Sequence, residues 1–153
     1  MARADFAFCH ALKVRWSEVD MQKVVFNGHY LNYFDVAVYE SWRAIVESGI
    51  AAHGPALRER FDGWIHNIYV VKATCEYHGP ARWNDDLDIG VRVAKLGRSS
   101  MRTVLEIHRG TEHLISGELI YVYKDPVANV SAPLPEDFKA LIGAFEKVAP
   151  EGL

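Results

Sequence analysis

The hydrophobic period changes near the start of the chain. Residues 8–16 alternate between apolar and polar positions, which is typical of a half-buried strand. From about Gly28, apolar residues recur every three or four positions, and this predicts a helix of about five turns with Asn27 as its N-cap and Gly49 as its C-terminal stop. The stripe consists of Leu31, Phe34, Val38, Trp42 and Ile45. A helix this apolar is expected to be wrapped by other elements.

The rest of the chain reads mainly as strands. After a short helix predicted at 55–60, strand-like stretches lie at 65–77, 87–94, 101–108 and 114–123. Their connections are short enough for antiparallel neighbours, and a terminal helix is expected at about 136–147. The predicted class is α+β, with a curled antiparallel sheet wrapped around one long central helix. Long, flat edge strands invite pairing with another subunit, so we expect a homo-oligomer.

Length and composition favour a single domain. The 153 residues are enough for one core, which we place at about 8–135 within a domain spanning 1–153. Two distant cysteines, Cys9 and Cys75, argue against a disulfide framework and point to a cytoplasmic location. The formal net charge of −3 indicates neither a nucleic acid nor an anionic membrane as partner, and no apolar run is long enough for a membrane span.

Familiar cofactor motifs do not occur in the sequence. We find no dinucleotide or nucleotide phosphate loop, no serine-nucleophile elbow and no zinc-protease helix motif. None of the seven histidines falls into a tight ligand spacing. We therefore expect neither a metal nor a cofactor.

The segment from Val14 to Tyr30, VRWSEVDMQKVVFNGHY, is the most informative for chemistry. It runs from a strand through a polar turn into the start of the apolar helix. A helix start presents unpaired N–H groups that can bind an oxyanion, and Asp20 lies just upstream. A carboxylate beside oxyanion donors suits acyl transfer. The alternative is that Asp20 is a turn residue bonded to its own backbone.

This segment resembles the hotdog-fold acyl-CoA thioesterases of the 4-hydroxybenzoyl-CoA thioesterase type, including the Tol–Pal-associated branch. The family pattern is similar to R-[YF]-x-[DE]-x-D-x-x-G-[VI]-V-[YF]-x-x-x-Y. The matching positions are Arg15, Trp16, Glu18, Asp20, Val24, Val25, Phe26 and Tyr30. Two weaker blocks, 70–85 and 96–101, extend the resemblance to about residues 10–135.

The resemblance implies roles for residues around the helix start. Asp20 matches the catalytic carboxylate, which either attacks the thioester carbonyl or activates water. The backbone N–H groups of Asn27 and Gly28 match the oxyanion donors. His29 and Tyr30 are possible accessory residues, and His29 is also interpreted as a residue that only lines the helix.

The resemblance also implies where the substrate binds. Residues Val71 and Lys72 match a substrate-binding strand, and the turn formed by Gly97, Arg98, Ser99 and Ser100 matches the region that meets coenzyme A in relatives. Within this turn Arg98 is the candidate for a phosphate contact, because a guanidinium suits phosphate; the alternative is a solvated turn arginine.

The sequence departs from the family pattern at several positions. Lys23 replaces the glycine that follows the catalytic aspartate, so the turn and the acyl entrance are expected to differ. In the Tol–Pal-associated branch a histidine lies at the position of Asn27 and an asparagine at that of His29, as if the two were exchanged. Trp16 replaces a tyrosine.

The leading hypothesis is an acyl-CoA thioesterase that needs no cofactor, since coenzyme A is part of the substrate. The resemblance implies a homodimer or homotetramer whose active site is completed at the subunit interface. One alternative is a hotdog hydratase or dehydratase acting on acyl-CoA or acyl-carrier protein, with His29 and Asp20 as an acid–base pair. Another is a non-catalytic acyl-CoA-binding module.

Overall fold

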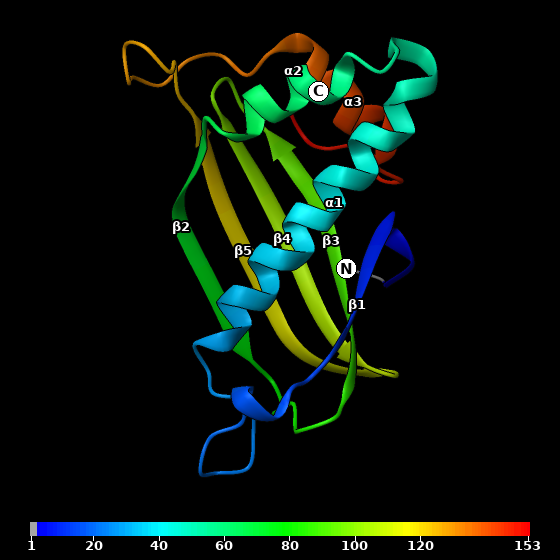
Figure 1. Cartoon of the computed structure of the whole chain (residues 1–153), viewed down its shortest axis with the longest axis vertical. Helices are drawn as coiled ribbons and strands as arrows, with labels where there is room; N and C mark the ends of the chain where they lie inside the picture. Colours follow the sequence, from blue (N-terminus) through cyan, green and yellow to red (C-terminus); the bar gives the residue numbers. More distant parts are fainter. Residues whose placement is uncertain (1–2) are drawn as a thin grey trace.

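Five antiparallel strands form one curled sheet beside a long helix (Figure 1). The computed structural model describes residues 3–153, so the first two residues of the expected domain lie outside the described part. Along the chain the elements are η1 (Arg3–Asp5), β1 (Phe8–Lys13), η2 (Trp16–Glu18), α1 (His29–His53), α2 (Leu57–Ile65), β2 (Ile68–Tyr77), β3 (Asp86–Leu96), β4 (Ser100–Arg109), β5 (Glu112–Tyr123) and α3 (Glu136–Phe145). The strand order is β1-β3-β4-β5-β2. These features confirm the predicted α+β hotdog fold.

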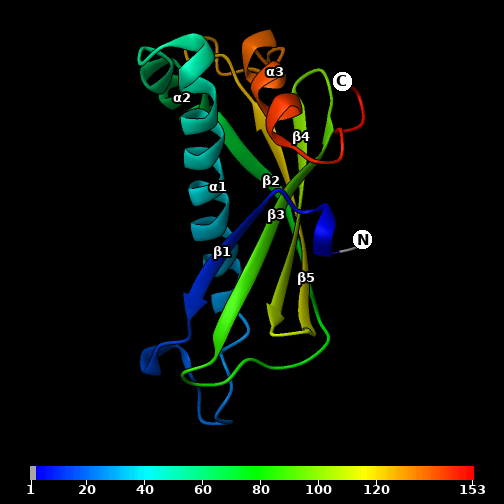
Figure 2. The same ribbon diagram turned by 90° about the vertical axis from the view of Figure 1, so that its right-hand side faces the viewer.

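The helix α1 covers one face of the sheet, as the two perpendicular views show (Figures 1 and 2). Most of its apolar stripe faces inward: Phe34 is completely buried, and Val38 and Ile45 are nearly so, whereas Leu31 is exposed. Gly117 on β5 lies beneath the Phe34 ring, and a Cβ atom at this glycine would come within 2.4 Å of the ring carbons. The absence of a side chain at Gly117 therefore allows the helix to approach the sheet.

We expect Gly117→Ala to destabilise the fold. The added methyl group would displace Phe34 from a filled core, and overpacking of this kind costs about 1–3 kcal/mol of unfolding free energy. Chemical denaturation would measure the loss. Gly63→Ala is the matched control, because no atom lies within 4 Å of a Cβ at that helical glycine. Equal stability of the Gly117 variant and the wild type would contradict this close approach.

Both predicted ends of the long helix are wrong. The N-cap residue is Gly28 rather than Asn27, and no side chain caps the helix start. The helix also continues past Gly49 to His53 and stops at Gly54, whose φ of 80° is left-handed. Gly49 instead allows tight packing, since a Cβ there would lie 2.5 Å from Leu141 of α3.

Other boundaries shift by a few residues. The predicted first strand ends at Lys13, and Trp16 lies in η2 with 73% of its surface exposed, in edge-to-face contact with Trp83. α2 is longer and begins later than expected, β2 begins at Ile68, and α3 ends at Phe145. Hydrophobic periodicity does not report contacts between distant segments, so it gives the ends of elements only approximately.

The strand β2 forms one edge of the sheet and is strongly exposed. Its first half carries Tyr69, Val70 and Val71, each about half accessible to solvent. The helix α1 also leaves Leu31 and Val36 exposed, so the sheet wraps only part of the helix. Within residues 3–153, no helix has the length and apolar character needed to cross a membrane.

Candidate active site

A tight turn between η2 and α1 holds Asp20. The Asp20 carbonyl accepts the N–H of Lys23 at 2.9 Å, and the Asp20 N–H donates to the Val24 carbonyl at 3.0 Å. Val25 then donates to the Ala81 carbonyl at 2.8 Å, which ties the turn to the β2–β3 connection. Backbone hydrogen bonds within the turn, together with the bond from Val25 to the β2–β3 connection, therefore fix the position of Asp20.

Lys23 adopts the backbone conformation that glycine favours. Its φ is 65°, in the left-handed region that costs a residue with a side chain about 1–2 kcal/mol. The resemblance places a glycine at this position, and the substitution led us to expect a different turn. The structure instead shows a lysine in the backbone region that a glycine occupies readily.

One carboxylate oxygen of Asp20 accepts a hydrogen bond within the turn. Its Oδ1 accepts the N–H of Gln22 at 2.8 Å, which is the local bond that the turn-residue alternative predicts. The same residue also lines a cavity of about 330 Å³ together with Asn27, Tyr30 and Tyr77. The local bond orients the carboxylate and leaves its other oxygen without a hydrogen bond to any described residue.

The start of α1 supplies N–H donors at this cavity. His29 donates to the Phe26 carbonyl at 2.9 Å, whereas within the described residues the N–H groups of Asn27 and Gly28 donate to no backbone carbonyl. They stand at the positive end of a 25-residue helix. The Tyr77 hydroxyl donates to the Asn27 carbonyl at 3.4 Å, which links the end of β2 to the helix start.

The Tyr30 side chain lines the cavity and contacts the loop that follows β2. It is buried, and its hydroxyl oxygen accepts the N–H of Ala81 at 3.0 Å. Burial raises the pKa of Tyr30, so the hydroxyl stays protonated at neutral pH. Tyr30 therefore fixes the 78–81 loop over the cavity.

Sequence reasoning gave no role to Glu18, which the structure shows to be a buried carboxylate behind the turn. Its carboxylate accepts the Arg15 N–H at 2.7 Å and the Arg15 guanidinium at 3.0 Å, while its carbonyl accepts the N–H of Phe26 at 2.9 Å. Burial alone would raise the pKa of Glu18, but the bonds from Arg15 hold it below its ordinary value. The only sequence signal was its place in the family pattern. The sequence analysis also missed Tyr77, because only the folded structure brings the end of β2 next to the start of α1.

His29 does not meet Asp20. It lines a separate cavity of about 690 Å³ together with Arg15, Glu18 and Asp35, and its ring contacts Phe26 edge to face at 5.6 Å. The structure thus does not bring together the acid–base pair that a hydratase would use.

The other predicted binding residues lie away from this cavity. Val71 is exposed at an irregularity of β2, and Lys72 lines a cavity on the outer face of the sheet. The 97–100 turn joins β3 to β4 at the end of the sheet opposite the Asp20 turn (Figures 1 and 2). Of the predicted site residues, Asp20, Asn27 and Tyr30 line this one cavity, and Gly28 follows Asn27 in sequence.

Comparisons with known proteins identify the family of the chain. The sequence model of the thioesterase superfamily matches residues 22–116. None of the curated proteins compared by sequence matches the chain.

Several solved thioesterase structures share the fold of this chain. A thioesterase from Thermus thermophilus, solved with coenzyme A and zinc, has a TM-score of 0.77 at 25% identity, over 94% of this chain and 97% of that chain. A predicted thioesterase from Bacillus stearothermophilus has a TM-score of 0.74 at 16% identity, over 95% and 98%. A 1,4-dihydroxy-2-naphthoyl-CoA thioesterase from Synechocystis has a TM-score of 0.69 at 19% identity, over 88% and 94%.

Proposed function

The chain belongs to the thioesterase superfamily and is a thioester hydrolase, and from this premise we propose that its substrate is an acyl-CoA and that Asp20 is the reacting carboxylate. One observation carries the proposal: a single cavity joins Asp20 to the start of α1 at Asn27. Relatives named for coenzyme A or its thioesters support the substrate class.

The start of α1 stabilises the transition state. As the thioester carbonyl is attacked, negative charge develops on its oxygen, and N–H donors aimed at that charge lower the barrier. The N–H groups of Asn27 and Gly28 provide such donors, and the helix dipole adds to them. The thiolate of coenzyme A then leaves with the electrons of the broken C–S bond.

Asp20 acts in one of two ways. Its free carboxylate oxygen either attacks the carbonyl carbon to form a mixed anhydride, which water then hydrolyses, or removes a proton from an attacking water. A single turnover in heavy-oxygen water tests for the anhydride. Label in the protein after that turnover indicates an anhydride that water hydrolyses at the Asp20 carbonyl carbon, whereas label in the product alone fits both the base and an anhydride hydrolysed at the acyl carbon.

Thiol release from a panel of aliphatic and aromatic acyl-CoA substrates tests the activity. We expect saturable hydrolysis of at least one substrate. Saturable acyl-CoA binding without any thiol release would overturn the proposal and favour an acyl-binding module, and hydration of an enoyl-CoA without thiol release would favour a hydratase.

We place the coenzyme A site between two copies of the chain. Antiparallel pairing of two β2 edges brings opposite ends of the two sheets together, so the 97–100 turn of a second copy would lie at the same end of the joined sheet as this Asp20. The unpaired edge of β2 and its exposed apolar residues support this arrangement. The site would then be complete only in the homo-oligomer.

Arg98 provides a test of the coenzyme A site. Its side chain is exposed on the β3–β4 turn, and a charged hydrogen bond to phosphate contributes about 1.5–3 kcal/mol. We therefore expect Arg98→Gln to raise KM for acyl-CoA about tenfold or more with little change in kcat. The control substrate is the matching acyl-pantetheine, which lacks the nucleotide. An equal rise in KM for both substrates would contradict a phosphate contact.

A further inference from the structure

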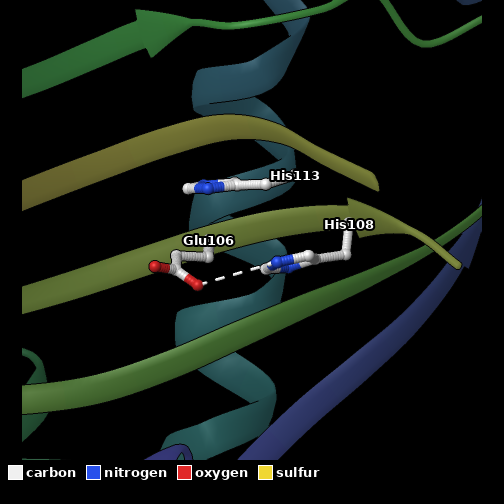
Figure 3. Close-up of side chains that lie close together, drawn as sticks. All are labelled: Glu106, His108 and His113. Atoms are coloured by element: carbon white, nitrogen blue, oxygen red, sulfur yellow. Dashed lines mark ion pairs between the residues drawn. The ribbon is translucent and has the colours of Figure 1, made fainter. Parts of the chain in front are cut away.

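Three polar side chains gather on the face of the sheet that turns away from α1. Figure 3 shows Glu106 and His108 on β4 and His113 on β5, in front of the sheet while the helix lies behind it. The His108 and His113 rings are stacked with centroids 4.8 Å apart, and Glu106 lies 3.8 Å from His108 Nε2. One ligand atom from each of the three residues lies within 4.8 Å of the other two.

Strand geometry brings these residues together. Glu106 and His108 are two positions apart on β4, so their side chains share one face of the sheet. His113 is the cross-strand partner of His108 beside the β4–β5 turn. A cross-strand pair places the two Cβ atoms about 4.5–5.5 Å apart. The backbone therefore fixes the positions of all three groups.

A fourth group, His78, approaches from the end of β2. Its Nε2 lies 2.9 Å from Ser116 Oγ, which in turn lies 3.1 Å from His113 Nε2. The His78 and His113 rings are 4.9 Å apart. Ser116 thus connects His113 to His78, which also lines the Asp20 cavity.

We propose that Glu106, His108 and His113 bind a zinc-type divalent transition-metal ion on the outer face of the sheet. Imidazole nitrogens with one carboxylate oxygen are the donor set that zinc takes in proteins. Zinc–ligand distances of about 2.0–2.2 Å require the side chains to close in slightly on the ion. His113 Nε2 would exchange its 3.0 Å contact with the Ile115 carbonyl and its 3.1 Å contact with Ser116 Oγ for the metal.

Metal titration of the tag-free full chain tests the proposal. We expect isothermal titration calorimetry to give one Zn²⁺ per chain, and Co²⁺ to show the visible absorption of a four-coordinate ion. The Tm should rise with Zn²⁺, because a ligand that binds only the folded state stabilises it. Absence of saturable Zn²⁺ binding to the wild type would overturn the proposal.

Substitutions then assign the ligands. We expect His108→Gln and His113→Gln each to weaken Zn²⁺ binding by at least about 100-fold, because the loss of even an outer partner of a ligand costs 10–100-fold. His53→Gln is the matched control, since His53 is exposed at the end of α1. Equal weakening by His53→Gln, or unchanged affinity of both cluster variants, would overturn the assignment.

A conservative substitution tests the third ligand with little risk to the fold. Glu106→Gln keeps the shape of the side chain while removing its charge, and we expect it to weaken Zn²⁺ binding by about tenfold or more. Circular dichroism and Tm in the presence of a chelator show whether each variant is folded. A folded Glu106 variant that binds as tightly as the wild type would exclude Glu106 from the site.

Discussion

Asp20→Asn should lower kcat for acyl-CoA hydrolysis by about 10²–10⁴-fold, the range that a positioned acid–base or nucleophilic group contributes. The amide lacks the negative charge that attacks the carbonyl or accepts a proton from water. Its oxygen can still accept the N–H of Gln22, so the turn should keep its shape. A thiol-release assay measures kcat, and the Tm reports the fold.

Asp125→Asn is the matched control for this substitution. Asp125 Oδ1 also accepts backbone N–H groups in a tight turn, from Val127 at 2.9 Å and Ala128 at 2.7 Å. It does not line the Asp20 cavity, so its loss should leave hydrolysis unchanged. Wild-type turnover by Asp20→Asn would reduce Asp20 to a turn residue and end the mechanistic assignment.

The overall fold could be predicted because its hydrophobic patterns are local and strong. The three- and four-residue period that includes Phe34 extends over many turns, and the alternating strands that follow leave few arrangements for burying it. The ends of α1 could not be predicted. Gly49 reads as a stop in sequence, but contacts with Leu141 of α3 determine its role.

The candidate site was predictable where its residues are neighbours in sequence. Asp20 and Asn27 belong to one short segment, so the family pattern could identify them. Tyr77 and the buried role of Glu18 depend on how β2 and the turn fold against α1. The pairing of His108 with His113 depends on strand register across a turn, which a search for close ligand spacing does not detect.

Val70→Asp should separate the proposed dimer and remove activity with it. Val70 lies on the free edge strand with 46% of its surface exposed. Two copies paired through β2 would bury each new carboxylate in the interface without a partner, and an unpaired buried charge costs several kcal/mol. This cost raises the dissociation constant of the dimer by about 100-fold or more. Analytical ultracentrifugation would report the change in oligomeric state.

Activity measured against protein concentration connects this separation to catalysis. The Val70 variant should lose hydrolysis in dilute solution and recover part of it as the concentration rises, because association restores the missing half of each site. Val127→Asp provides the control, since Val127 is 93% exposed in the loop between β5 and α3 and should tolerate a charge. A wild type that is monomeric and fully active would show that one chain contains the whole site, and the interface would then have no part in catalysis.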